Sequence, residues 1–200
     1  MARYRNASRA LPIIFVFIII VIAVVAMIAL TRAVFFSGSS KTAKVDTSEQ
    51  SLLDVSDGHS VSMTVRGPIV ADEAFHSYTI DVSPSSRELT TYSGYEDTIV
   101  DQSSLPNNDA AYTQFVFALD KANLVKGTDD QSDIRGICAS GRVYQFTIYN
   151  GGSPVKSLWT STCSGSRGTL KANVGQLSTL FLNQIPNATD MTRRVGFNNI

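Results

Sequence analysis

Near its N-terminus the chain carries an unbroken apolar segment that runs from Ala10 to Leu30 without a charged residue. As a helix, its 21 residues would extend ~30 Å, the hydrocarbon thickness of a bilayer. The segment has no polar face, which a surface helix of a soluble domain would show. It is also longer than the apolar core of a cleaved signal peptide, which spans about 7–15 residues. The pattern therefore predicts one transmembrane helix over residues 11–31.

The residues on either side of this segment indicate its orientation. Residues 1–10 form a short tail, and residues 32–58, rich in Ser, Thr, Asp and Lys, are predicted to form a polar linker. Three basic side chains precede the span and three follow it, so the side chains alone do not decide the direction. The free N-terminal amine and the tight clustering of the leading arginines favour a cytoplasmic N-terminus. We therefore predict a single-pass signal anchor in the cell membrane, with an extracytoplasmic C-terminal domain.

Beyond the linker, apolar and small polar residues alternate in several short stretches. This period of two predicts half-buried β-strands. The stretches are residues 61–66, 77–82, 87–92, 142–149 and 155–162. A turn over Ser83–Ser86 should place Ile80 opposite Leu89 in a hairpin. Residues 93–107 lack a pattern and are interpreted as an irregular connection.

Two further segments carry apolar residues at helical spacing. The first is capped by one of the polar residues 107–109 and should end near residue 123. The second is capped by Asn173 and should stop at Pro186.

The predicted order of elements is β-ββα-ββα, which indicates an α+β domain over residues 59–186. We expect an antiparallel sheet of about five strands, with both helices packed on one face. Residues 187–200 are predicted to be a C-terminal tail.

The chain contains two cysteines, Cys138 and Cys163. They flank a predicted hairpin whose turn is Asn150-Gly151-Gly152, a strong turn signal. Folding the hairpin about this turn would bring the two cysteines together at its open end. We therefore predict a disulfide that closes a loop of about 25 residues and adds ~3 kcal/mol of stability.

The same hairpin carries large apolar side chains that should face the core. Tyr144, Phe146 and Ile148 alternate along its first strand. We expect Val155 and Trp159 of the second strand to share this face, which should be the core face.

A catalytic cysteine is the alternative to a disulfide. Membrane-anchored sortases have this size and topology, and Cys163 follows a threonine as the sortase nucleophile does. Its base would have to be His59 or His76, which lie farther upstream than that family usually places its histidine. A helix is also predicted after Cys163, where a sortase has a strand. We interpret both histidines as polar surface residues and identify no catalytic residue.

Other known chemistries lack their signature residues. Asp129, Asp130 and Asp133 resemble a calcium loop, but Ile134 and Ser140 stand where an EF-hand requires Gly and Glu. We interpret this acidic segment as a solvated loop. The chain has no phosphate-binding or zinc-binding motif, so the sequence predicts no cofactor and no metal.

Charge is distributed unevenly along the chain. Residues 46–200 carry 11 basic and 17 acidic side chains, a net charge of −6. An acidic domain lacks the basic surface that binds nucleic acid. We therefore favour a non-enzymatic domain that is held at the bilayer by residues 11–31. Its partner would be an unidentified protein or envelope polymer. The alternative is an envelope enzyme that uses Cys163.

The second half of the domain resembles a group of bacterial proteins. The similarity covers residues 136–186 and rests on Gly136-Ile137-Cys138, Leu158-Trp159-Thr160, Thr162-Cys163 and Leu180-Phe181. These motifs resemble uncharacterised single-pass membrane proteins of candidate-phylum bacteria of the Saccharibacteria kind. The resemblance implies a bacterial cell-surface protein in an oxidising exterior, and it implies no known reaction.

Overall fold

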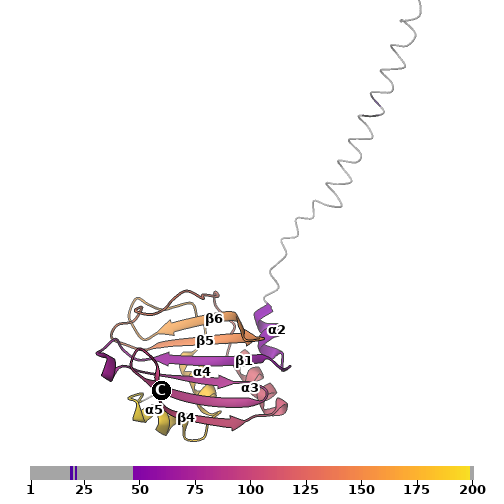
Figure 1. The fold of residues 1–200 in the computed structure, drawn as a ribbon. Helices are drawn as coiled ribbons and strands as arrows, with labels where there is room; N and C mark the ends of the chain where they lie inside the picture. The colour runs from indigo at the N-terminus through magenta and orange to yellow at the C-terminus, as the bar shows by residue number, and fades with distance from the viewer. Residues whose placement is uncertain (1–18, 20, 22–46, 199–200) are drawn as a thin grey trace, which may run out of the picture. The chain divides into compact units, whose positions relative to one another are not determined.

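One antiparallel sheet of six strands organises the fold (Figure 1). The strands are β1 (His59–Arg66), β2 (His76–Val82), β3 (Ser86–Ser93), β4 (Thr98–Pro106), β5 (Val143–Asn150) and β6 (Ser153–Ser161). Their spatial order is β4-β3-β2-β1-β5-β6, so the first strand in sequence lies inside the sheet. The predicted α+β class and antiparallel sheet are confirmed, and the sheet has six strands rather than about five.

Apart from the 3-10 helix η1 (Asp72–Ala74), which has no buried residue, all helices of the described domain pack on one face of this sheet, which is the far face in Figure 1. They are α2 (Thr47–Leu53), α3 (Asp109–Lys121), α4 (Val174–Leu182) and α5 (Ala188–Arg194). The two predicted helices, α3 and α4, begin at the predicted caps. The side chain of Asn108 accepts a hydrogen bond from the Ala111 N–H at 2.9 Å, and that of Asn173 from the Gln176 N–H at 3.0 Å.

The hydrophobic core lies between this face and the helices. Met63 of β1 stands between Ile80 of β2 and Phe146 of β5, and all three are buried. Ile80 in turn lies opposite Leu89 of β3, as predicted. Phe181 of α4 packs on Phe146 with ring centroids 5.8 Å apart. We call this side of the sheet the core face and the opposite side the open face.

The computed structural model describes residues 19, 21 and 47–198. The predicted N-terminal tail (residues 1–10) lies outside the described residues. So do almost all of the predicted transmembrane segment (residues 11–31) and the part of the predicted linker up to residue 46. Within the described ranges, no helix is long and apolar enough to cross a bilayer.

Strand β4 corrects the prediction of an irregular connection over residues 93–107, whose sequence shows no pattern of a strand. It forms an edge of the sheet, and none of its side chains is fully buried. The residues that it turns toward the core face include Asp101 and Ser103, which are only half-buried. A bulge between Thr91 and Tyr92 of β3 also interrupts the pairing. An edge strand of this kind shows no hydrophobic alternation.

The prediction that Trp159 shares the core face with Phe146 is wrong. The β5–β6 register shifts between Ile148 and Tyr149, so that Ile148 lies opposite Lys156 and Tyr149 opposite Pro154. This bulge at the turn moves each later residue of β6 by one position. Leu158 therefore lies opposite Phe146 in the core, and Trp159 lies on the open face.

Both predicted domain boundaries fall inside the folded unit. Helix α2 occupies the end of the predicted linker 32–58, and its Leu52 is fully buried in the core. Helix α5 occupies the predicted tail 187–200, and Phe197 packs edge-to-face on Tyr78 with ring centroids 4.9 Å apart. These segments are short and hold only a few apolar residues each, so they have the composition of loops.

Two chain segments cover the edge of the sheet at β6. The first is the acidic loop, whose Asp130 N–H donates to the Ser157 carbonyl at 2.9 Å. The second is the segment that follows Gly168. The carbonyl of Trp159 accepts hydrogen bonds from the Thr169 and Leu170 N–H groups at 2.9 and 3.0 Å. Gly168 adopts a positive φ of 69° just before them, and a Cβ at this position would overlap the Trp159 carbonyl. The close approach of the two backbones therefore requires glycine.

We expect Gly168→Ala to lower the free energy of unfolding by about 1–3 kcal/mol more than Gly165→Ala. Both glycines have positive φ, so both variants carry backbone strain. A Cβ at Gly165 would meet no atom within 4 Å, which makes it the matched control. Urea unfolding followed by circular dichroism measures the difference. Equal losses would contradict the close contact.

We expect Leu52→Ala to cost about 2–5 kcal/mol of stability, because it leaves a cavity in the core. Gln50→Ala, at an exposed position of the same helix, should change stability by less than about 0.5 kcal/mol. The same unfolding measurement tests both. If residues 47–58 were a linker, both variants would be as stable as the original chain.

Candidate functional site

The predicted disulfide is present and joins the open end of the β5–β6 hairpin. Cys138 and Cys163 are bonded with an S–S distance of 2.07 Å and a Cα–Cα distance of 5.5 Å. Ile134, Val143 and Trp159 pack around it in a small second core on the open-face side of the sheet. The disulfide therefore ties the segment before β5 to the end of β6.

The sulfur of Cys163 is not a free thiol in this arrangement. It is bonded to Cys138, and no cysteine of the chain is free. A cysteine nucleophile requires a thiolate, so the structure does not assemble the sortase-like site considered for Cys163.

The two histidines lie at different ends of the sheet region. His59 is only 6% exposed, so its interpretation as a surface residue is wrong. Its Nδ1 lies 3.1 Å from Ser56 Oγ and its Nε2 lies 3.5 Å from Asp54 Oδ2, at the turn between α2 and β1. His76 is half-buried and lines a cavity of about 580 Å³ that also includes Arg142.

The acidic loop before β5 is partly structural. The Asp129 carboxylate accepts a hydrogen bond from the Ser157 N–H at 2.7 Å, and Asp130 accepts one from the Trp159 indole N–H at 2.8 Å. Hydrogen bonds with Ser132 and Trp159 hold the pKa of Asp130 below its usual range. The loop was interpreted as simply solvated, but these two side chains fasten it to β6.

Toward β6, Val143 and Trp159 of the open face join the second core, and Ser62, Thr90 and Thr147 of this face are buried. The rest of the open face is an array of hydroxyl, amide and carboxyl groups. It begins with Thr64 and Thr79, whose hydroxyl oxygens lie 3.1 Å apart across β1 and β2. Toward the edge of the sheet, Gln102 of β4 donates to the Glu88 carboxylate at 2.7 Å. Asp81 and Gln102 are exposed, so these longer side chains reach solvent.

Large exposed apolar side chains of the described domain lie away from the middle of this face. They are Ile69, Val70, Tyr95, Ile99, Val100 and Phe117. Three belong to the loops at one end of the sheet, two to β4 at its edge, and one to α3. The middle of the open face is therefore polar, which differs from the apolar centre of a typical stable protein interface.

Asp81 and Glu88 form the most charged point of the open face. They lie directly opposite each other on β2 and β3. Desolvation by the surrounding protein raises the pKa of the Asp81 carboxyl, and the nearby Glu88 charge adds to the rise. A hydrogen bond with Ser62 opposes this effect. Two facing carboxylates destabilise a sheet, so this pair costs the fold some stability at neutral pH.

These open-face residues were not identified from the sequence. The signal available was the polar half of each alternating strand, such as Ser62 and Thr64 in β1 and Thr79 and Asp81 in β2. Alternation alone does not show which strands are neighbours, or that the helices leave this face uncovered. Both facts depend on the strand order.

We expect Asp81→Asn to raise the free energy of unfolding at about pH 7, by less than ~1 kcal/mol. Because the pKa of the Asp81 carboxyl is raised in the folded state, the free energy of unfolding falls as the pH rises through that pKa. Asparagine has no titrating carboxyl and removes this loss. The gain should disappear below about pH 4, where the carboxyl is protonated in both states. Urea unfolding at the two pH values tests this. Asp57→Asn, in the exposed turn before β1, removes the same charge away from Glu88 and should give no such gain.

Comparisons with known proteins found no match. No protein-family model matches the chain, and no curated protein matches it.

Proposed function

We propose that this protein is a membrane-tethered, extracytoplasmic binding domain whose open sheet face binds an envelope polymer. The observation that carries the proposal is the polar array on a sheet face that the helices of the described domain leave uncovered. A flat surface of this kind presents many hydrogen-bond donors and acceptors at the regular spacing of neighbouring strands.

The polarity of the face favours a polar polymer over a protein partner. An apolar patch of several hundred Å² on this face would indicate a protein interface, but its centre is built from groups such as Thr79, Asp81, Glu88 and Gln102. A polysaccharide offers hydroxyl groups along its whole length, and it can exchange hydrogen bonds with such a surface at many points.

The tether and the location are inferred from the sequence together with the cysteine pair. The charge-free run from Ala10 to Leu30 has the length of a membrane span. A disulfide between Cys138 and Cys163 is typical of a protein that folds in an oxidising compartment. Both observations support a domain held on the outer side of a membrane.

The proposal is tested by co-sedimentation of the full chain, in a mild non-ionic detergent, with peptidoglycan sacculi, chitin particles and cellulose particles. Binding to at least one of these polymers is expected. Thr79→Arg places a long side chain in the middle of the open face and should weaken that binding about tenfold or more.

The matched control is Thr179→Arg, which introduces the same side chain at an exposed position of α4, on the other side of the sheet. It should bind as the original chain does. Absence of binding to every polymer would contradict the proposal, and so would equal effects of the two substitutions. Circular dichroism checks that both variants are folded.

A further inference from the structure

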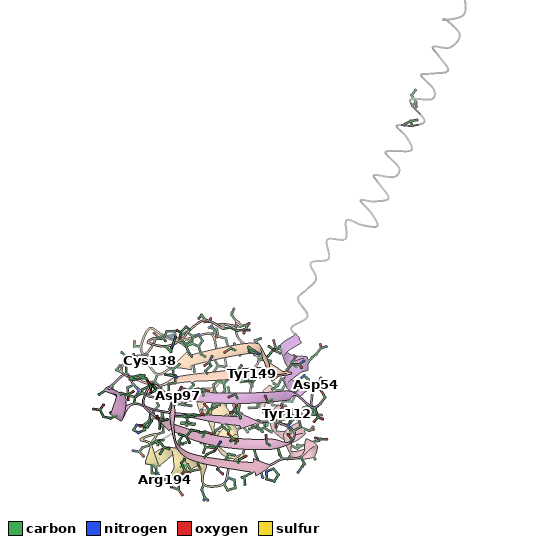
Figure 2. The ribbon with its side chains drawn as sticks, in the orientation of Figure 1. Asp54, Asp97, Tyr112, Cys138, Tyr149 and Arg194 are labelled. Carbon is green, nitrogen blue, oxygen red and sulfur yellow. A yellow bond between two sulfur atoms is a disulfide. The ribbon has the colours of Figure 1, made fainter. Side chains whose placement is uncertain are left out.

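A cleft of about 250 Å³ lies at the end of the sheet where β1 finishes. Its lining includes Arg66, Ile69, Phe75, Tyr95, Arg135 and Cys138. It lies at the end of the sheet where Figure 2 labels Cys138 and Asp97, opposite the end marked by Asp54 and Tyr112.

The cleft continues the open face. Arg66 follows Ser62 and Thr64 on the open-face side of β1, and it lies opposite Val143 of β5, which also lines the cleft. A polymer that lies along β1 on the open face would therefore reach this cleft at the end of the strand.

Arg66 supplies the binding chemistry of the cleft. Its guanidinium carbon lies 5.1 Å from the centre of the Phe75 ring, and the side chain is half-buried. Cation–π contact of this kind fixes the plane of a guanidinium without using its N–H groups. Arg66 donates no hydrogen bond to any residue between 47 and 198, so its N–H donors remain available to a ligand.

The second arginine of the cleft is already engaged. Arg135 binds Asp133 through its Nε and Nη2 at 2.6–2.9 Å. This contact lowers the pKa of Asp133 to about 2, so its charge persists and balances that of Arg135. The charge of Arg66 also helps to lower the pKa of Asp133, but the Asp133 carboxylate is bonded to Arg135. Among the described residues, Arg66 is therefore the arginine of the cleft without a bonded carboxylate.

Tyr95 provides a rigid aromatic surface beside this charge. Its ring stacks on Phe75 with centroids 4.1 Å apart and planes 16° apart. Its hydroxyl accepts from the Val70 N–H at 3.0 Å and donates to the Val70 carbonyl at 2.7 Å. Tyr95 is nevertheless 40% exposed as a residue. An aromatic ring held in this way suits the apolar face of a sugar ring.

We propose that this cleft binds a carboxylated sugar unit, such as a uronic acid, with its carboxylate on Arg66 and its ring against Tyr95. The inference rests on the proposed function, because it names the chemical class of the polymer that the open face binds. The net charge of −6 over residues 46–200 would repel a dense polyanion. The polymer should therefore carry isolated carboxylates among neutral sugars.

The test uses calorimetric titration of the full chain in detergent with three soluble probes. These are a neutral glucose oligosaccharide with one terminal glucuronic acid, its methyl ester, and the same oligosaccharide ending in glucose. The free acid should bind about tenfold or more tightly than the ester or the neutral probe. Arg66→Gln should remove that preference. Arg193→Gln, which removes the same charge from the exposed end of α5, should preserve it.

Two results would overturn the inference and leave the proposed function standing. One is equal binding of acid and ester to a chain that still sediments with an envelope polymer. The other is an acid preference that survives Arg66→Gln. As a further comparison, a glutamate-rich peptide and a glycerol-phosphate oligomer are titrated in the same way. If either binds through Arg66 while the glucuronic acid probe does not, the inference is also overturned, and the cleft binds a different class of anion. Failure of all polymers and probes would overturn both proposals.

Discussion

The pairing of β1 with two neighbours is the constraint on which the rest of the structure depends. This strand is bonded along its length to β2 on one side and to β5 on the other. Strand β2 follows it closely in the chain, whereas β5 comes only after α3 and the acidic loop. The pairing therefore closes a long loop, whose entropy must be offset by burial of the core face. Val61, Met63 and Val65 are fully buried there.

The sequence predicted those parts of the fold that depend on local patterns. Strong alternation identified five strands, and the caps at Asn108 and Asn173 located two helices. Prediction from the sequence failed where the structure of a segment depends on the strand with which it pairs. The side of the sheet on which Trp159 lies depends on a bulge at Ile148, and β4 exists because β3 offers it a partner. The residues of the open face could not be predicted for the same reason, because they come together only through the order of the strands in the sheet. The disulfide of Cys138 could be predicted, because it depends on a single hairpin.

The two edges of the sheet are protected to different degrees. At β6, backbone hydrogen bonds from Asp130 and Thr169 cover the strand from outside. At β4, the protection comes from individual residues instead of a covering segment. They are Pro106 at the end of the strand and Asp101, which forms an ion pair of 2.8 Å with Arg194. Charged side chains and proline are common means of preventing edge strands from joining other chains. An edge protected in this way leaves the adjacent open face accessible, whereas a covering loop at β4 would obstruct it.

The disulfide acts on the candidate cleft as well as on the hairpin. Cys138 lines the cleft, and the bond to Cys163 fixes the segment that carries Ile134 and Arg135 close to Arg66. The backbone also packs closely around the disulfide itself, because a Cβ on Gly141 would meet Thr162 Oγ1 and the sulfur of Cys138. Ligand binding by loops is usually weakened by the entropy lost when those loops become ordered. Here the covalent bond, together with the hydrogen bond from Trp159 to Asp130, orders the wall of the cleft before any ligand arrives. The proposed ligand would therefore meet a surface that is already ordered, outside the hydrophobic core.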